Sequence, residues 1–95
     1  MILKNINLTT LDGTQTAVVD VDVNYPGRRS FADGDIYPAR GESLPIWILE
    51  TGNEALLPFQ ERQLRILINS SNRQPMPRGR HPESATFISN GFHDA

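Results

Sequence analysis

Residues 15–25, QTAVVDVDVNY, alternate apolar and polar side chains over most of their length. One parity carries Ala17, Val19, Val21, Val23 and Tyr25, and the other carries Val18, Asp20, Asp22 and Asn24. A period of two residues is that of a β-strand, because successive side chains on a strand point to opposite faces. The pattern therefore predicts a strand with a valine face towards a core and an acidic face towards solvent.

The polar residues of this stretch also have the spacing of the first ligands in a calcium loop. A calcium loop that began at Asp20 would need Gly at its sixth position and Glu at its twelfth. Tyr25 and Phe31 occupy those positions. Carboxylates on one strand face lie about 6.5–7 Å apart, too far for neighbours to share an ion unless the chain bends. A metal site would require Asp33 and Asp35 to fold back onto the strand, so we predict no metal and no cofactor.

Residues 2–10 have a weaker alternation of apolar and polar side chains, which also predicts a strand. Asp12 and Gly13 follow it, and Asp-Gly is a strong hairpin signal because both residues tolerate positive φ. We therefore predict an antiparallel hairpin that joins residues 2–10 to residues 15–25.

The middle of the chain is harder to interpret. Residues 26–42 have no lasting period, and we interpret them as one loop, longer than the ~12–15 residues expected of an idle connection. Residues 43–50, SLPIWILE, are apolar on both parities, which is typical of a central strand. Pro45 removes one backbone donor, so the first residues of this predicted strand should lie at a sheet edge or a bulge.

The second half of the chain leaves one choice open. Residues 54–69 fit either a strand near 62–70 or a helix, and we favour the strand because its apolar residues recur at period two. Residues 69–84 carry three prolines and predict a loop. Residues 85–89 predict a short last strand.

Together these elements predict a mainly β, or β-rich α+β, fold. We expect a small antiparallel sandwich or barrel of about four to six short strands built from hairpins, with any helix around residues 54–69. The chain of 95 residues is short enough for one domain. We predict a β-rich domain over residues 1–72 and an arm rich in Pro and Arg over residues 73–95, in which residues 85–89 form the last strand.

Charge is distributed unevenly along the chain. The net charge is −2, but residues 1–61 hold nine acids and four bases, whereas residues 62–82 hold five arginines and no acid. Such asymmetry can attract a charged partner or a neighbouring copy of the same protein. Eight of the nine bases are Arg, which forms two-pronged bonds to carboxylate and phosphate. A GC-rich genome would produce the same bias through its codons.

Two segments supply candidate residues for binding a partner or an anion. In the long loop, guanidinium groups and an aromatic ring could hold a phosphate or a carboxylate. In the arm, an acid-free run could become ordered on a partner. The candidates are Arg28, Arg29, Tyr37 and Arg40 in the loop, and Arg73, Arg78, Arg80 and His81 in the arm. The alternatives are a solvated loop whose arginines pair with nearby acids, and a passive tail.

A second set of residues is a candidate for self-association. Asp20 and Asp22 form an acidic stripe that could meet arginines of another copy. Phe87 and Phe92 are unusual in an arm, and they either close the core or dock on a neighbour. A terminal strand that adds to another subunit's sheet would be one route to such docking.

Several classes of function lack support in the sequence. The chain has no cysteine and two histidines, and it shows no nucleophile elbow, zinc-protease motif, P-loop or dinucleotide fingerprint. The basic segment lacks the interleaved aromatics of nucleic-acid binders. No apolar run approaches the ~20 residues of a membrane helix, and the N-terminus does not resemble a signal peptide. We therefore expect no enzyme and no nucleic-acid or membrane partner.

The leading hypothesis is a small non-enzymatic interaction protein that binds other proteins and copies of itself. Its size and composition suit an accessory, inhibitor or assembly component, for instance of a phage or mobile element. We expect it in the cytoplasm, which would be that of the host cell if the protein is viral. The alternative function is binding of a small phosphate-containing ligand or nucleotide through the arginines of the loop and the arm.

Overall fold

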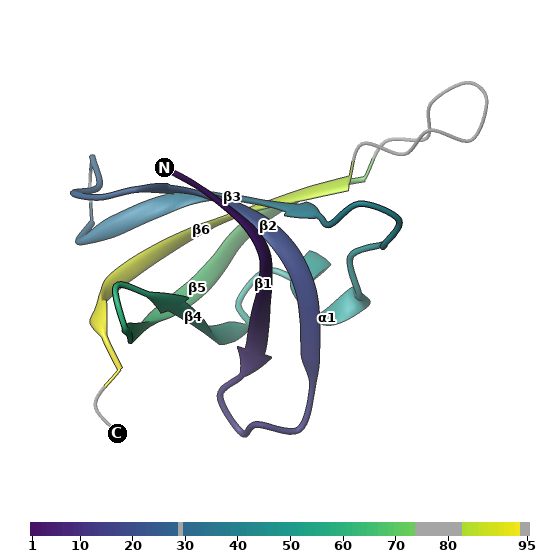
Figure 1. Cartoon of the computed structure of the whole chain (residues 1–95), viewed down its shortest axis with the longest axis horizontal. Helices are drawn as coiled ribbons and strands as arrows, with labels where there is room; N and C mark the ends of the chain where they lie inside the picture. Colours follow the sequence, from purple (N-terminus) through teal and green to yellow (C-terminus); the bar gives the residue numbers. More distant parts are fainter. Residues whose placement is uncertain (29, 74–82, 94–95) are drawn as a thin grey trace.

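The computed structural model describes residues 1–28, 30–73 and 83–93. Six antiparallel strands close into a small barrel in the order β1-β2-β3-β6-β5-β4, as Figure 1 shows. The strands are β1 (Ile2–Thr10), β2 (Thr16–Asn24), β3 (Ala32–Pro38), β4 (Glu54–Phe59), β5 (Arg62–Arg73) and β6 (Glu83–Phe92), and one short helix, α1 (Ile46–Leu49), precedes β4. The predicted small antiparallel β-fold is therefore confirmed.

The alternation in β2 builds the core as predicted. Val19, Val21 and Val23 are each at most 1% exposed, while the aspartates between them face outwards. Burial of one such valine contributes roughly 1.5–3 kcal/mol. The other strands add inward residues of the same kind, and the largest are Leu8, Ile36, Leu57, Leu64, Ile66, Ile68 and Phe87. The predicted hairpin of the first two strands is also present, with Leu8 paired to Ala17.

The interpretation of residues 26–42 as a single loop is wrong, because β3 lies within it. Its inward positions are Ala32, Gly34 and Ile36, so the alternation contains a glycine where a larger apolar residue would mark a strand. The glycine is required by close packing. A Cβ on Gly34 would lie 1.9 Å from the carbonyl oxygen of Asp22 and 3.0 Å from the ring of Phe87.

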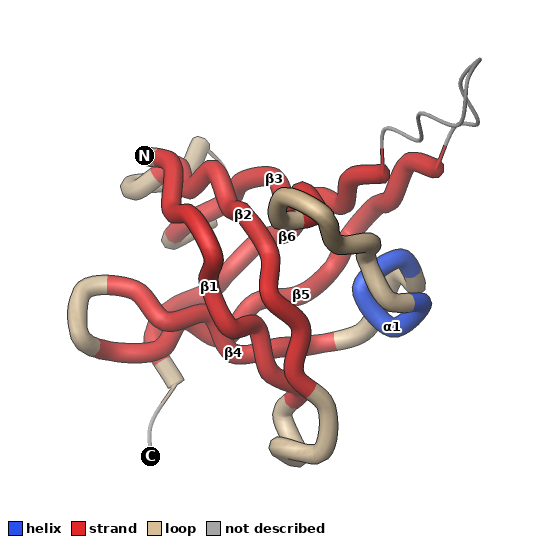
Figure 2. Tube along the Cα trace, turned by 45° about the vertical axis from the view of Figure 1, so that its right-hand side comes forward, coloured by secondary structure: helices blue, strands red, loops and turns tan. Residues whose placement is uncertain are grey.

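The predicted strand over residues 43–50 is also wrong. Its centre forms α1, a single turn that begins after Pro45, whose carbonyl accepts the N–H of Ile48. Leu44 and Ile48 are 4% and 0% exposed, because the segment closes one end of the barrel (Figure 2). The apolar residues on both parities therefore reflect a plug at the barrel end. The backbone N–H of Leu44 is held by the carboxylate of Glu83 on β6, at 2.8 Å.

In the described part of the chain, no helix has the length and apolar character needed to cross a membrane.

Residues 54–69 form a hairpin of β4 and β5, so the helix alternative for this segment is wrong and the preferred strand is confirmed. Gln60 and Glu61 make a two-residue turn in which both have positive φ, 53° and 61°. Neither is glycine or asparagine, which such turns favour. This turn therefore stores backbone strain at an exposed position.

The barrel is closed by a short ladder between β1 and β4. The two strands pair only at Thr9↔Leu56 and Thr10↔Ala55. Phe59 and Arg62 flank a two-residue turn and are therefore a hydrogen-bonded pair of the β4–β5 ladder. Hydrogen-bonded pairs alternate with non-hydrogen-bonded pairs along an antiparallel ladder, so the backbone N and C=O of the next residue, Pro58, point away from β5 and towards β1. Pro58 has no N–H to donate there, so the ladder ends before it.

β6 makes the C-terminal part of the chain an integral barrel element. It pairs with β3 on one side and with β5 on the other, so residues 83–92 lie within the fold. This arrangement does not match a division into a domain over residues 1–72 and an arm over 73–95. Residues 69–73 and 83–84, interpreted as loop, extend the same two strands, and residues 74–82 lie outside the described part of the chain.

We expect Gly34→Ala to destabilise the protein severely, by about 3 kcal/mol or more, because the added methyl group meets the backbone of β2. Urea denaturation measures the loss. The matched control is Gly13→Ala, at a turn residue whose φ is 76° and whose Cβ would meet nothing within 4 Å. The control should lose only about 1–2 kcal/mol. Equal losses for the two variants would contradict the close packing described at Gly34.

Glu61→Gly should stabilise the hairpin of β4 and β5 by about 1 kcal/mol, because glycine adopts positive φ without a steric penalty. The measurement is the shift in the urea midpoint relative to the natural chain. Glu61→Gln removes the same charge and keeps the strain, so it should leave the midpoint nearly unchanged. A stabilisation of the same size in both variants would assign the effect to charge.

Candidate partner-binding surface

The outer sides of β2 and β3 form one acidic face, which we define as Asp20, Asp22, Asp33 and Asp35 together with Tyr37. The strand register sets Asp22 opposite Asp35 and Asp20 opposite Tyr37. The stripe of two aspartates expected from the sequence is therefore half of a wider surface. The second half was missed because β3 was interpreted as a loop.

Two carboxylates of the acidic face are occupied by hydrogen bonds within the chain. Asp20 accepts the backbone N–H of Asn5 at 3.0 Å, where positive φ marks a bulge in β1, and it lies 3.4 Å from the Lys4 ammonium. Asp33 accepts the side-chain amide of Asn24 and the backbone N–H of Arg28, each at 2.9 Å. These bonds to Asn24 and Arg28 lower the pKa of Asp33. Both aspartates therefore help to hold the fold.

The other two carboxylates, those of Asp22 and Asp35, have fewer hydrogen bonds and ion pairs within the described part of the chain. Asp22 lies 3.5 Å from the amino group of Met1, and both groups are exposed, so this contact contributes little. Among the described residues, no hydrogen bond or ion pair reaches the carboxylate of Asp35. Its pKa is raised by partial burial and by the negative charges of Asp22 and Asp33. This part of the face therefore favours the approach of a cation.

A hollow of about 310 Å³ lies on the acidic face. Its apolar walls are Ile2, 65% exposed, and Tyr37, 44% exposed. Burial and the charges of Asp35 and Asp22 raise the pKa of Tyr37, so its hydroxyl stays neutral at ordinary pH. The remaining lining comes from Lys4, Asp20, Val21 and Asp22. The hollow thus combines an aromatic ring, an aliphatic side chain, the ion pair of Lys4 with Asp20 and the carboxylate of Asp22.

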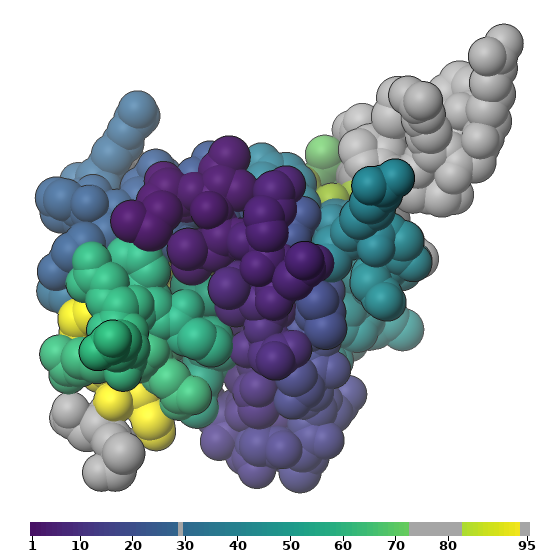
Figure 3. Space-filling model, in the orientation of Figure 1, coloured from purple at the N-terminus to yellow at the C-terminus, as the bar shows by residue number. Residues whose placement is uncertain are grey.

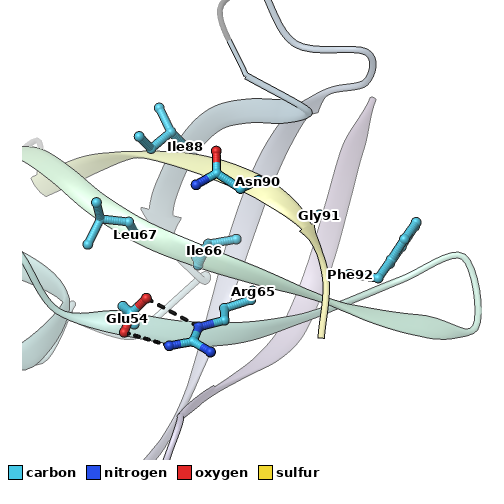
Figure 4. A pocket seen from close by; sticks show the side chains of 8 residues that line it. All are labelled: Glu54, Arg65, Ile66, Leu67, Ile88, Asn90, Gly91 and Phe92. Atoms are coloured by element: carbon cyan, nitrogen blue, oxygen red, sulfur yellow. Dashed lines mark hydrogen bonds and ion pairs between the residues drawn. The ribbon is translucent and has the colours of Figure 1, made fainter. Parts of the chain in front are cut away.

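The basic side of the barrel is carried by β5. Arg65 donates from Nε and Nη2 to the carboxylate of Glu54, at 3.2 and 3.1 Å, and the guanidinium of Arg62 lies 4.0 Å from the ring centre of Phe92. A shallow hollow of about 370 Å³ lies beside the Arg65 pair, between β5 and β6 (Figure 4). Because Glu54 neutralises Arg65, this hollow offers little net charge to a ligand.

One end of the barrel carries an aromatic cluster that sequence reasoning missed. Tyr25 packs against Phe31 and Phe59 with ring centres 5.2 and 5.5 Å apart, and Phe31 packs against Phe92 at 5.4 Å. Tyr25 and Phe31 remain 44% and 37% exposed. The four rings come from three separate segments, so no local spacing in the sequence announces them.

The phenylalanines proposed for self-association have different positions. Phe87 is 1% exposed and fills the core beside Gly34, so it closes the barrel and offers no surface to a neighbour. Its placement among the self-association candidates is therefore corrected. Phe92 is partly buried in the aromatic cluster, where the Arg62 guanidinium covers its ring.

The arginines predicted to bind a partner or an anion do not converge in the described residues. Arg28 precedes β3 and Arg40 follows it, and a strand of seven residues separates two such positions by roughly 20 Å. They cannot share one phosphate. Arg73 is the last residue of β5. Residues Arg29, Arg78, Arg80 and His81 lie outside the described part of the chain.

The described residues contain no group of three or more His, Asp or Glu side chains placed to hold a metal ion. The acidic face is thus a set of carboxylates spread along two strands, with spacing set by the sheet.

Comparison with known proteins gives no match to any family model, curated protein or solved structure.

We expect Asp35→Asn to raise the melting temperature at pH 7, because the fold raises the pKa of this carboxyl and its ionised form costs stability. This loss of folding stability is fully present at pH values above the pKa of Asp35 in the folded protein, and it vanishes as the pH falls below the ordinary value of 3.8. The gain should therefore be small, below about 1 kcal/mol, and should disappear near about pH 3. Calorimetry across this pH range measures it.

Asp33→Asn is the matched control and should change stability in the opposite direction. The pKa of Asp33 is lowered by its hydrogen bonds, so its ionised form stabilises the fold above the ordinary value, and that contribution is lost as pH falls. A melting temperature that falls in both variants at pH 7 would contradict the electrostatic difference between the two aspartates.

Proposed function

We propose that this chain is a small non-enzymatic interaction protein that binds protein partners, including copies of itself, through oppositely charged sides of its barrel. The observation that carries the proposal is the strand order. In the ring β1-β2-β3-β6-β5-β4, β2 and β5 lie three positions apart, so they face opposite ways across the core.

This arrangement separates charge in space as well as in sequence. The acidic face lies on β2 and β3, whereas residues 62–82, with five arginines and no acid, begin with β5 on the far side. Within one copy, Arg62 and Arg65 of β5 are held against Phe92 and Glu54, so the two sides do not meet through these arginines. They can meet between copies, where opposite potentials attract and steer association.

The contact between copies would be heterologous, because an acidic side meets a basic side instead of its own equivalent. Such contacts build rings when the rotation closes and filaments when it does not. This geometry suits an assembly or accessory component, including one of a phage or mobile element in its host cytoplasm. A different protein with a basic surface could occupy the acidic face in the same way.

The electrostatic part of the contact should be weak and dependent on salt. Exposed ion pairs contribute about 0–1 kcal/mol each, and ions screen them within roughly 8–10 Å at ordinary ionic strength. Glu54 already neutralises Arg65, which lowers the charge available on β5. Several pairs must therefore act together, and apolar residues such as Ile2 and Tyr37 must add to them.

The test is sedimentation of the full chain at low and high salt. We expect reversible self-association at about 20 mM salt that largely disappears at about 500 mM. Asp22→Asn with Asp35→Asn should reduce the association by roughly tenfold in affinity, because both uncompensated carboxylates of the acidic face lose their charge. Arg78→Gln with Arg80→Gln should reduce it similarly.

The matched control is Glu50→Gln with Glu61→Gln, which removes the same charge from exposed positions off the acidic face. It should associate as the natural chain does. A strictly monomeric natural chain at low salt and high concentration would contradict self-association. Equal weakening by the control pair would show that net charge acts, and not the acidic face.

A further inference from the structure

We infer that Asn90 is a site of spontaneous covalent modification, at which the backbone of Gly91 attacks the side-chain amide and converts it to a carboxylate. Both residues lie near the end of β6, in the wall of the hollow beside Arg65 (Figure 4). The yellow atoms of this end of the chain reach the molecular surface in Figure 3. This chemistry does not depend on the proposed function.

The reaction uses groups that are already neighbours in the chain. The backbone nitrogen of Gly91 forms a bond to Cγ of Asn90, and the proton of that nitrogen passes to hydroxide. The bond from Cγ to Nδ2 then breaks, and Nδ2 takes a proton from water and leaves as ammonia. Water next opens the succinimide ring at either of its carbonyls, which gives aspartate or isoaspartate. Water is thus the co-reactant, and no oxidation or reduction takes place.

The structure leaves the amide of Asn90 open to this attack. The side chain is exposed and has no hydrogen bond with the described residues that would hold the amide in place. Asn90 is also the extra residue of a bulge, because Ser89 and Gly91 pair with consecutive residues of β5. A bulge leaves its extra residue unpaired and disrupts the ladder locally. The backbone at this position can therefore rearrange more readily than that of a regular strand.

The residue after Asn90 lowers the steric barrier to ring closure. Glycine has no Cβ, so its nitrogen can approach the preceding side chain more closely than the nitrogen of a larger residue can. The φ of Gly91 is 148°, and a Cβ placed there would meet nothing within 4 Å, so the surrounding space is open. The N–H of Gly91 donates to Ser89 Oγ at 3.2 Å, which is the long end of the range for such bonds. This bond therefore holds the nitrogen only weakly.

The two other places where Asn or Asp precedes Gly lack these features. Asp12 precedes one of these glycines, but hydrogen bonds from two nearby threonines hold its carboxylate. Asp33 precedes Gly34, whose close packing against β2 leaves no room for the backbone to rearrange. An ionised carboxylate also resists nucleophilic attack more than a neutral amide does. Asn90 is therefore the residue at which the reaction should run.

The products would change the surface around Arg65. The new carboxylate joins a hollow whose cation is already held by Glu54, so the basic side of the barrel gains a negative charge. Isoaspartate also adds a carbon to the main chain shortly before Phe92, which should loosen the contact of that ring with Phe31. The modification would therefore act on both the charge of this side and the aromatic cluster.

Peptide mapping of the full, folded chain by mass spectrometry tests the site directly. After incubation in warm, mildly alkaline buffer, we expect the peptide with Asn90 to gain the mass difference between NH2 and OH. Part of that peptide should contain isoaspartate, which is identified by its own fragments. The rate should rise with hydroxide concentration, because the attacking nitrogen must lose its proton. Asn90→Gln should abolish the change, since its longer side chain would have to close a larger ring.

Asn7 is the matched control within the same chain. Its side chain is also exposed and has no hydrogen bond with the described residues, but Leu8 follows it in a regular part of β1. We expect Asn90 to react at least about tenfold faster than Asn7, because only Asn90 is followed by a residue without a side chain.

Two results would overturn the inference. Equal rates at Asn90 and Asn7 would show that the glycine and the bulge have no effect on the reaction. An amide at Asn90 that is lost in the urea-denatured chain but retained in the folded chain would show that β6 holds this segment too rigidly. Loss of the amide in both states would support the inference.

Discussion

The barrel depends on the close packing of three strands around one glycine. At Gly34, the carbonyl of Asp22 approaches from β2 and the ring of Phe87 approaches from β6, leaving no space for a side chain. This contact holds β3 between its two neighbours. It also determines the surface, because Asp33 and Asp35 flank the glycine and must point outwards when it points inwards. Core packing and the acidic face therefore have one origin.

Surface charges follow the roles that the fold gives them. Asp20 and Asp33 satisfy backbone N–H groups at a bulge and at a turn, so their charges are partly used inside the chain. Among the described residues, no backbone N–H donates to the carboxylate of Asp22 or Asp35. The same residue type thus serves the fold at two positions and leaves charge available at two others, and only hydrogen-bond partners distinguish them. This difference explains why the proposed contact depends on Asp22 and Asp35.

The strongest sequence patterns predicted the fold well, and the weaker ones did not. Val19, Val21 and Val23 determine β2 because large apolar residues at period two can bury only one side of a strand. β3 was missed because Gly34 removes the apolar signal at its centre. The plug around Ile48 was mistaken for a strand, since a short apolar run that closes a barrel end has no period of its own.

The candidate surface was predicted in part, for a similar reason. Asp20 and Asp22 could be assigned to an outer face from their own strand. Their neighbours across the sheet, including Tyr37, required the register between β2 and β3, which no local pattern contains. The aromatic cluster brings Tyr25, Phe59 and Phe92 together from distant segments, and it also depends on the closed topology.

The short ladder between β1 and β4 has a consequence for the order of folding. The hairpins β1–β2 and β4–β5 join neighbours in sequence, so each can form with little loss of chain entropy. Closure joins Thr9 to Leu56, far apart in the chain, and gains only two residue pairs in return. Contacts with high entropic cost and small reward form late. The sheet should therefore be largely assembled, and its core largely dry, before the ring is completed.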